Sequence, residues 1–207
     1  DEGYGGWTRY TQVLRDGLRR NGHTVSVCSK ESGLPHPLSL LARPYLLLKA
    51  AFTLRREIRL RKPDVVHVTV EPYALVLPFL GQSLCKRSVL TIHGSYGIRL
   101  CRIPVLRFLF FHALRKIGRI VTVSDYTKNR MNMELEGISD RLRETFMQKT
   151  VAVHNGIELP PTYERRPHVG RRILLVGPVK PRKGVIEALE AISEYGKNDA
   201  VLTVVGT

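Results

Sequence analysis

A glycine turn near the start of the chain is the first feature whose residues could do chemistry. Residues 3–8 read GYGGWT and stand directly before a predicted helix, with Gly5 and Gly6 at its mouth. Glycines let the backbone approach a phosphate closely, and a helix N-terminus presents unpaired amides to an anion. The spacing departs from the dinucleotide fingerprint GxGxxG, because Thr8 stands where the third glycine belongs. The turn is therefore either a phosphate-binding site or a purely structural turn.

A histidine ends a predicted strand in the run VLTIHG, where it is His93. In open α/β sheets the ligand crevice lies outside the carboxyl ends of the strands, and this imidazole would point there. His93 is therefore a candidate catalytic residue. The alternative is a histidine that only closes the end of its strand with a hydrogen bond.

A cluster of three cations, Lys180, Arg182 and Lys183, leads into the start of another predicted helix at Gly184. Cations beside unpaired helix amides are suited to binding a diphosphate. Arg182 and Lys183 are therefore candidate phosphate-binding residues. A solvated basic turn is the alternative.

Metal and disulfide chemistry are not indicated by the sequence. The seven histidines show no HxxxH or HxH spacing, so we expect no metal site and no cofactor. Cys28, Cys85 and Cys101 are odd in number and far apart, which favours a reducing, cytoplasmic compartment. The longest apolar stretches, residues 45–54 and 105–114, each contain a charge and are too short to span a bilayer.

Short apolar strands alternate with amphipathic helices along most of the chain. Strands are expected at residues 24–28, 65–70, 88–92, 119–123, 149–154, 172–176 and 200–205, and helices at 7–21, 44–61, 71–84, 104–116 and 184–195. Residues 124–128 are expected to turn from a strand into a helix capped by Ser124 or Asp125. This alternation predicts an α/β fold with parallel sheets covered by helices.

A stretch rich in proline and charge, residues 158–171, interrupts this alternation and is predicted to be a linker. We therefore expect two doubly wound, Rossmann-like domains at residues 1–157 and 172–207. The first is expected to lack an initial strand, because a glycine turn of this kind normally follows one. The second has two predicted strands, too few for a core of its own, and is expected to be truncated.

Six segments, taken in order, resemble glycosyltransferase family 4, whose retaining members have two facing Rossmann-like domains of the glycosyltransferase B type. The first is Gly5-Gly6 with its helix running to NGHTVSV. The others are KPDVVHV at 62–68, LTIHG at 90–94, VTVS at 121–124, VHNGIE at 153–158 and ILLVGPVKPRKG at 173–184. The ordered set covers nearly the whole chain.

The resemblance implies an enzyme that transfers a hexose from a nucleotide-sugar donor to a glycan or lipid-linked acceptor with retention of anomeric configuration. It implies that Gly5 and Gly6 lie against the donor diphosphate and that His93 contacts the transferred sugar. Lys183 matches the lysine that neutralises the leaving diphosphate. No metal is required if protein cations do this.

The chain departs from the family pattern at Pro178, where members often carry arginine. Lys180 or Arg182 is the available substitute, and a non-catalytic nucleotide-sugar binder is the alternative that this departure leaves open. The family's Glu-x7-Glu pair, which holds the donor sugar and ribose, is expected beyond Thr207. We therefore expect these 207 residues to be inactive alone.

The charge is strongly positive, with 33 Lys and Arg against 18 Asp and Glu and a net charge of +15, which favours anionic partners. Cations flank the apolar run 108–111, a pattern that suits peripheral docking on the cytoplasmic face of an anionic membrane. The helix at 45–61 allows the same interpretation, and solvated core helices are the alternative. A basic nucleic-acid-binding protein is a further alternative. The cations are scattered and no nucleic-acid-binding motif is present, so we expect no nucleic-acid partner.

Overall fold

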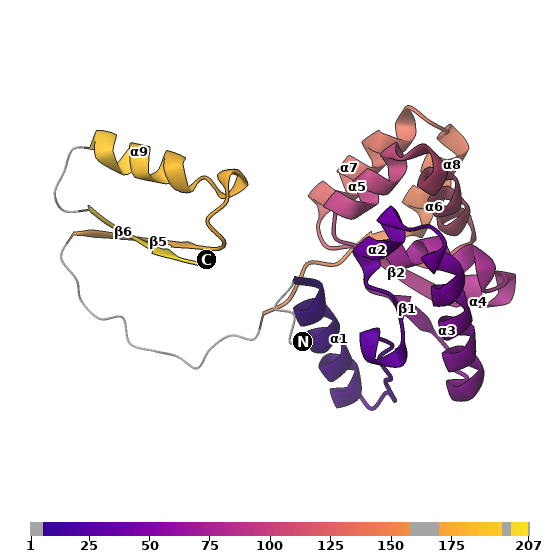
Figure 1. The fold of residues 1–207 in the computed structure, drawn as a ribbon. Helices are drawn as coiled ribbons and strands as arrows, with labels where there is room; N and C mark the ends of the chain where they lie inside the picture. The colour runs from indigo at the N-terminus through magenta and orange to yellow at the C-terminus, as the bar shows by residue number, and fades with distance from the viewer. Residues whose placement is uncertain (1–5, 158–169, 196–199, 207) are drawn as a thin grey trace. The chain divides into compact units, whose positions relative to one another are not determined.

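The chain divides into two compact units, Asp1–Ile157 and Glu158–Thr207, which we describe separately. The structure, a computed structural model, describes residues 6–157, 170–195 and 200–206 (Figure 1). Each unit contains a parallel sheet with helices packed on it, so the predicted α/β, Rossmann-like class is confirmed. Gly5 lies outside the described residues.

The first unit alternates strands with helices. Its strands are β1 (Val66–Val68), β2 (Ser88–Ile92), β3 (Arg119–Thr122) and β4 (Thr150–Ala152). Its helices are α1 (Gly6–Arg20), α2 (Pro37–Ala42), α3 (Leu46–Arg61), α4 (Gln82–Lys86), α5 (Ser95–Arg102), α6 (Pro104–Lys116), α7 (Asp125–Glu136) and α8 (Asp140–Lys149), with 3-10 helices η1 (Lys30–Ser32) and η2 (Glu71–Phe79). Among the described residues, none of these helices is long and apolar enough to cross a membrane.

The four strands of this unit form one parallel sheet in the order β1-β2-β3-β4. Their register sets Val68, Leu90, Ile120 and Thr150 in one row across the sheet. Because every strand runs in the same direction, all four begin at one edge and end at the other. Loops that follow the strands therefore gather at a single edge.

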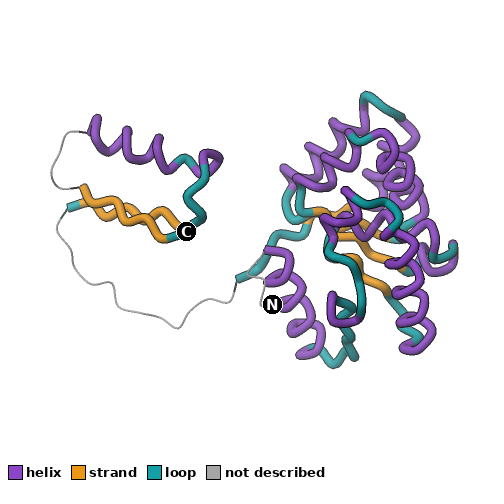
Figure 2. The backbone as a smooth tube through the Cα atoms, viewed as in Figure 1, coloured by secondary structure: helices purple, strands orange, loops and turns teal. Residues whose placement is uncertain are grey.

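The two faces of the sheet are covered unequally. Val68, Leu90, Ile92 and Ile120 point into a hydrophobic core that also contains buried residues of α2, α3 and α5 to α8. The opposite face carries Thr91, which α1 reaches through Tyr10. Figure 2 shows the strands between α1 and the other helices. No residue of α1 is fully buried, so this helix is held by a few polar and aromatic contacts at the sheet.

The prediction of a strand at residues 24–28 is wrong. These residues belong to no sheet, since β1 is the edge strand and pairs with β2 alone among the described residues. A strand needs the amides and carbonyls of a neighbour, and an apolar sequence cannot replace them. Val27 accordingly remains 41% exposed.

The prediction of one helix at residues 71–84 is also wrong. The segment is the 3-10 helix η2 followed by α4, with Pro78 inside η2 and Gly81 at a φ of 95° between the two. Proline lacks the amide that an α-helix requires, and the positive φ of Gly81 ends the first segment. Helix α5 begins at Ser95, directly after Gly94, and was not among the predicted helices. The helix after β3 is present, and Ser124 is its cap, accepting a hydrogen bond from the Thr127 amide at 3.1 Å.

The second unit contains β5 (Arg171–Val176) and β6 (Ala200–Val205), paired in parallel, with η3 (Pro181–Lys183) and α9 (Val185–Tyr195) between them in sequence. The carboxyl ends of the strands approach closely, since a Cβ on Gly206 would lie 1.8 Å from the carbonyl oxygen of Gly177. Only glycine therefore fits at position 206. Leu174, Val176 and Val201 are each more than half exposed.

Candidate functional site

The carboxyl edge of the first sheet collects polar residues from successive loops. Thr69 and Glu71 follow β1, His93 follows β2, and Ser124 follows β3. The strands are parallel, so these loops lie at one edge. His93 therefore stands where the sequence predicted it.

The imidazole of His93 is fixed in one tautomer. Its Nε2 lies 2.9 Å from the backbone carbonyl oxygen of Thr69. A carbonyl can only accept a hydrogen bond, so Nε2 carries the proton and donates it. In the neutral ring Nδ1 is then an acceptor. Within the described part of the chain Nδ1 makes no hydrogen bond, so it is the nitrogen of His93 available to a ligand.

A buried carboxylate holds the backbone at His93. The Glu71 side chain is fully buried, and its Oε1 accepts hydrogen bonds from the amides of His93 at 2.7 Å and Gly94 at 3.1 Å. Gly94 has a φ of 125°, a conformation that favours glycine. These two amides directly precede α5, so Glu71 occupies the place that a bound anion would take at this turn. Oε2 of Glu71 has no hydrogen-bond partner among the described residues.

The N-terminal turn of α1 is packed against the same edge. Trp7 lies against Tyr96 of α5 with ring centroids 4.8 Å apart, and Tyr10 meets His93 edge-on at 4.8 Å. Gly6, the first residue of α1, is exposed, and a Cβ placed on it would meet no atom within 4 Å. The described part of the glycine turn and His93 therefore share one edge of the sheet, with open space beside Gly6.

A chain of hydrogen bonds runs beneath this edge. Thr91 Oγ1 lies 3.0 Å from Tyr10 Oη and 2.8 Å from His67 Nε2. A second contact joins Thr11 Oγ1 to Thr69 Oγ1 at 2.9 Å. Burial, together with the neighbouring His93, lowers the pKa of His67 to about 4, so His67 is neutral at physiological pH. Side-chain hydroxyls thus fasten α1 to strands β1 and β2.

Lys183 is set over a glycine turn in the second unit. A Cβ on Gly177, which follows β5 at a φ of 147°, would lie 3.6 Å from Lys183 Cε and 3.8 Å from Nζ. The ammonium group therefore sits at the carboxyl end of β5, just before α9. Arg182 is part of η3, and its side chain lies outside the described residues. Glu187, in the first turn of α9, places a carboxylate near Gly184.

Sequence reasoning missed Glu71, Tyr10 and His67 as parts of this edge. Glu71 follows a predicted strand, and the rule that selected His93 applies to it equally. Tyr10 lies inside a predicted helix, and nothing in a sequence shows which strand that helix meets. His67 lies inside a strand, where alternation alone does not reveal its partner.

His67 predicts a pH dependence of stability. The unfolded chain binds a proton at His67 below about pH 6.5, but the folded chain does not until about pH 4. The free energy of unfolding therefore falls as the pH decreases from about 6.5 to 4, by about 3 kcal/mol from this residue. His67→Gln should remove this part of the slope in urea titrations, whereas His23→Gln, at an exposed position, should not. Equal slopes in the native protein and His67→Gln would contradict the assignment.

Comparison with known proteins agrees with this architecture. An uncharacterized glycosyltransferase of Methanocaldococcus jannaschii is 26% identical over 136 residues, which cover 65% of this chain and 35% of that protein. The chain thus spans about a third of the length of that relative. The sequence model described as Glycosyltransferase Family 4 matches residues 4–159, well over half of the chain. On this match, and with the parallel α/β sheet that accompanies it, the chain belongs to glycosyltransferase family 4.

Proposed function

We propose that the protein transfers a hexose from a nucleotide-sugar donor to a glycan or lipid-linked acceptor with retention of anomeric configuration. Membership of the family supports glycosyl transfer as the reaction. The observation that carries the finer proposal is the contact of α1 with the His93 loop, made by the Trp7–Tyr96 and Tyr10–His93 ring pairs. These contacts bring a helix N-terminus and an imidazole to one edge of a parallel sheet.

In this proposal the N-terminus of α1 in the first unit binds phosphate, with Gly5 and Gly6 as its candidate residues, and Lys183 and Arg182 are candidate phosphate-binding residues of the second unit. Cleavage of a sugar–phosphate bond leaves a diphosphate anion and an oxocarbenium-like sugar. Donors and cations aimed at the developing negative charge supply a large share of catalysis in such sites. No metal ion is required when the protein supplies this charge.

His93 is the residue assigned to the sugar. Its Nε2 is occupied by the Thr69 carbonyl, so Nδ1 is the atom that accepts a hydrogen bond from a sugar hydroxyl. This contact orients the sugar beside the reacting carbon. A ring held by Thr69 on one side and by Tyr10 on its edge needs little reorganisation on binding.

Retention follows from attack by the acceptor hydroxyl on the face that the diphosphate leaves. A double displacement would need a carboxylate free to attack the sugar. Glu71, the carboxylate bonded to the His93 loop, is fully buried and holds two amides, so it is unsuited to that role. Same-face attack needs no such carboxylate, and it is the route to retention that we propose.

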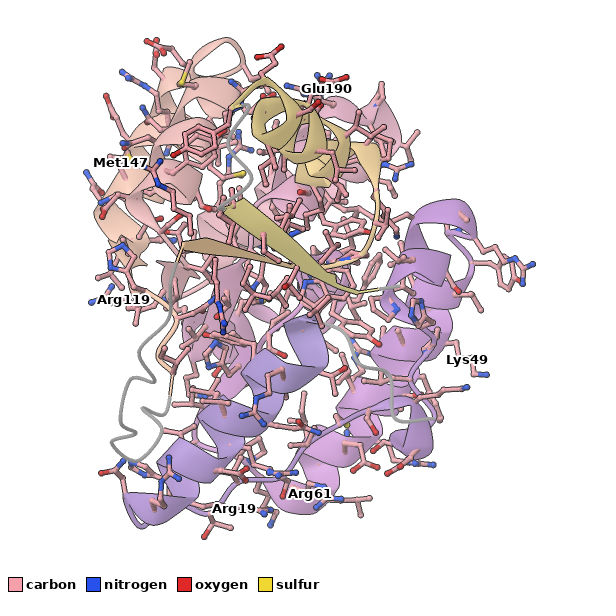
Figure 3. All side chains as sticks on the ribbon, turned by 90° about the vertical axis from the view of Figure 1, so that its left-hand side faces the viewer. Arg19, Lys49, Arg61, Arg119, Met147 and Glu190 are labelled. Carbon is pink, nitrogen blue, oxygen red and sulfur yellow. The ribbon has the colours of Figure 1, made fainter. Side chains whose placement is uncertain are left out.

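A basic, apolar face of α3 supports an anionic membrane surface as a partner. This face, the α3 face, carries Leu48 and Phe52, which are 67% and 72% exposed, together with Lys49 and Arg59. The acidic residue of α3, Glu57, is turned inward and pairs with Arg61 at 2.9 Å. Exposed rings and cations without an exposed carboxylate match the boundary of an anionic bilayer. Figure 3 shows Lys49 projecting away from the ribbon.

Helix α6 makes a smaller contribution to such a surface. Phe110 and Phe111 of its aromatic run are buried in the core, so the structural interpretation holds for them. Phe108 and Val105 are 72% and 71% exposed.

The thiols of Cys28, Cys85 and Cys101 are unpaired, which supports a cytoplasmic location and docking from that side.

His93→Ala tests the enzymatic proposal. In the full-length protein, the change should reduce transfer from a labelled nucleotide sugar by about a hundredfold or more, because it removes a contact to the reacting sugar. The affinity for nucleoside diphosphate, measured calorimetrically, should change little. His23→Gln is the control at an exposed histidine. Unchanged turnover in His93→Ala would refute the role of His93. Nucleotide binding without any transfer by the native full-length protein would favour the non-catalytic binder instead.

Leu48→Ser/Phe52→Ser tests the membrane partner. Burying these two side chains in a bilayer is worth several kcal/mol, so the double variant should bind vesicles containing phosphatidylglycerol at least tenfold more weakly in co-sedimentation. Both residues are exposed, so folding should be preserved. Met133→Ser/Ile186→Ser removes comparable exposed apolar surface elsewhere and should bind normally. Equal binding by the two double variants would contradict this partner.

A further inference from the structure

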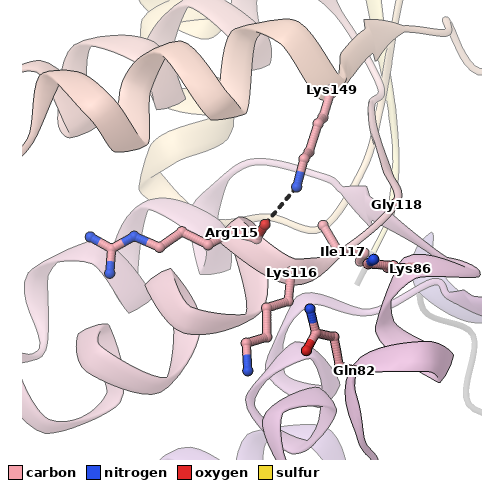
Figure 4. Close-up of a pocket in the computed structure, with 7 residues that line it drawn as sticks. All are labelled: Gln82, Lys86, Arg115, Lys116, Ile117, Gly118 and Lys149. Atoms are coloured by element: carbon pink, nitrogen blue, oxygen red, sulfur yellow. Dashed lines mark hydrogen bonds between the residues drawn. The ribbon is translucent and has the colours of Figure 1, made fainter.

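A basic hollow lies at the amino edge of the first sheet, opposite the candidate site. It has a volume of about 310 Å³ and is lined by Lys86, Arg115, Lys116 and Lys149 with Gln82 and Gly118 (Figure 4). Arg115 also lines a neighbouring hollow of about 410 Å³ with Arg141 and Thr145. None of these residues belongs to the site proposed for the donor.

The fold explains why cations meet here. Helices of this unit return from the carboxyl edge to the amino edge, so α4, α6 and α8 end beside the starts of the strands. Lys86, Lys116 and Lys149 each occupy a last helical turn, where the helix dipole favours a positive charge. This effect accounts for one cation at each helix end. Three helices end here, so it accounts for Lys86, Lys116 and Lys149, but Arg115 adds a fourth cation to the same hollow although like charges repel.

The positive charge of the basic hollow is not neutralised by the described residues. None of Lys86, Arg115, Lys116 and Lys149 forms an ion pair with a described carboxylate. Lys149 Nζ instead donates to the carbonyl oxygen of Arg115 at 2.6 Å. Burial, together with the nearby Arg119, lowers the pKa of Lys149.

The scaffold beneath the basic hollow is tightly built. The Gly118 amide donates to the carbonyl oxygens of Cys85 at 3.0 Å and Ser88 at 3.2 Å. A Cβ on Gly118 would lie 2.2 Å from the carbonyl oxygen of Lys86, so only glycine fits. The end of α4 and the start of β3 are therefore locked together. Cations carried on such a scaffold are positioned before any ligand arrives, which reduces the entropy lost on binding.

We propose that the basic hollow is a second anion site, which binds a phosphate-bearing ligand independently of the donor site. Its volume is at the lower end of the range for small-molecule sites and suits a diphosphate or a phospholipid headgroup. Lysine and arginine supply charge-assisted hydrogen bonds to phosphate oxygens, and Gln82 adds an amide donor. The ligand neutralises the repulsion among the four cations.

The test is a titration of the isotopically labelled protein with inorganic pyrophosphate, followed by NMR. The amides of Gly118 and Lys149 should shift and saturate. Lys86→Gln/Lys116→Gln should weaken this binding about tenfold or more, through the loss of two charge-assisted contacts. Arg43→Gln/Arg99→Gln removes the same charge from two other exposed positions and should leave it unchanged. A second arm measures co-sedimentation with vesicles of phosphatidylcholine with and without phosphatidylglycerol.

Each outcome decides the proposal. Saturable shifts at Gly118 that the Lys86→Gln/Lys116→Gln variant loses and the control keeps establish a soluble diphosphate as ligand. Loss of phosphatidylglycerol-dependent co-sedimentation in that variant alone identifies a lipid headgroup. Shifts confined to Gly6 and Lys183 would overturn the second site while supporting the donor site. Equal behaviour of the two double variants in both arms would also overturn it.

Discussion

The hydrogen bonds that Glu71 Oε1 accepts from the amides of His93 and Gly94 are the constraint on which the candidate site depends. A hydrogen bond to a charged group contributes about 1.5–3 kcal/mol, and a buried amide left unpaired costs a similar amount. The turn before α5 is therefore held in one conformation, and the His93 ring reaches the Thr69 carbonyl from it. The same carboxylate occupies these amides, so a ligand at this edge would meet them already paired, whereas Gly6 at the start of α1 is exposed.

The parallel sheet gives the first unit two chemically different edges. The carboxyl edge receives the loops after the strands, with Glu71, His93 and Ser124. The amino edge receives the ends of the returning helices, where the dipole favours Lys86, Lys116 and Lys149. Part of the +15 net charge thus follows from topology. The exposed cations of the α3 face, Lys49 and Arg59, lie along one helix and do not line the basic hollow.

Much of this architecture follows from the spacing of apolar residues and from the residues that end helices and strands. The alternation of apolar strands and helices predicted the α/β class, and the position of His93 after a strand predicted its edge. The prediction of a strand at residues 24–28 is wrong because a strand forms only beside a neighbouring strand, and the sequence alone does not show where such a neighbour lies. The prediction of one helix at residues 71–84 is wrong because it gave more weight to the apolar content of the segment than to Pro78 and Gly81, which break the helix. Glu71 was missed because a buried carboxylate is explained only by amides that lie 22 and 23 residues away.

The protonation pattern of the His93 imidazole tests the central claim most directly. Nitrogen-15 NMR of the labelled protein distinguishes a protonated ring nitrogen from a bare one. The hydrogen bond to Thr69 predicts that the neutral ring carries its proton on Nε2, and the proposed sugar contact predicts that the Nδ1 signal shifts when a donor binds. A neutral ring with its proton on Nδ1 would contradict the account. So would an Nδ1 signal that stays unchanged while shifts at other residues show that the donor has bound.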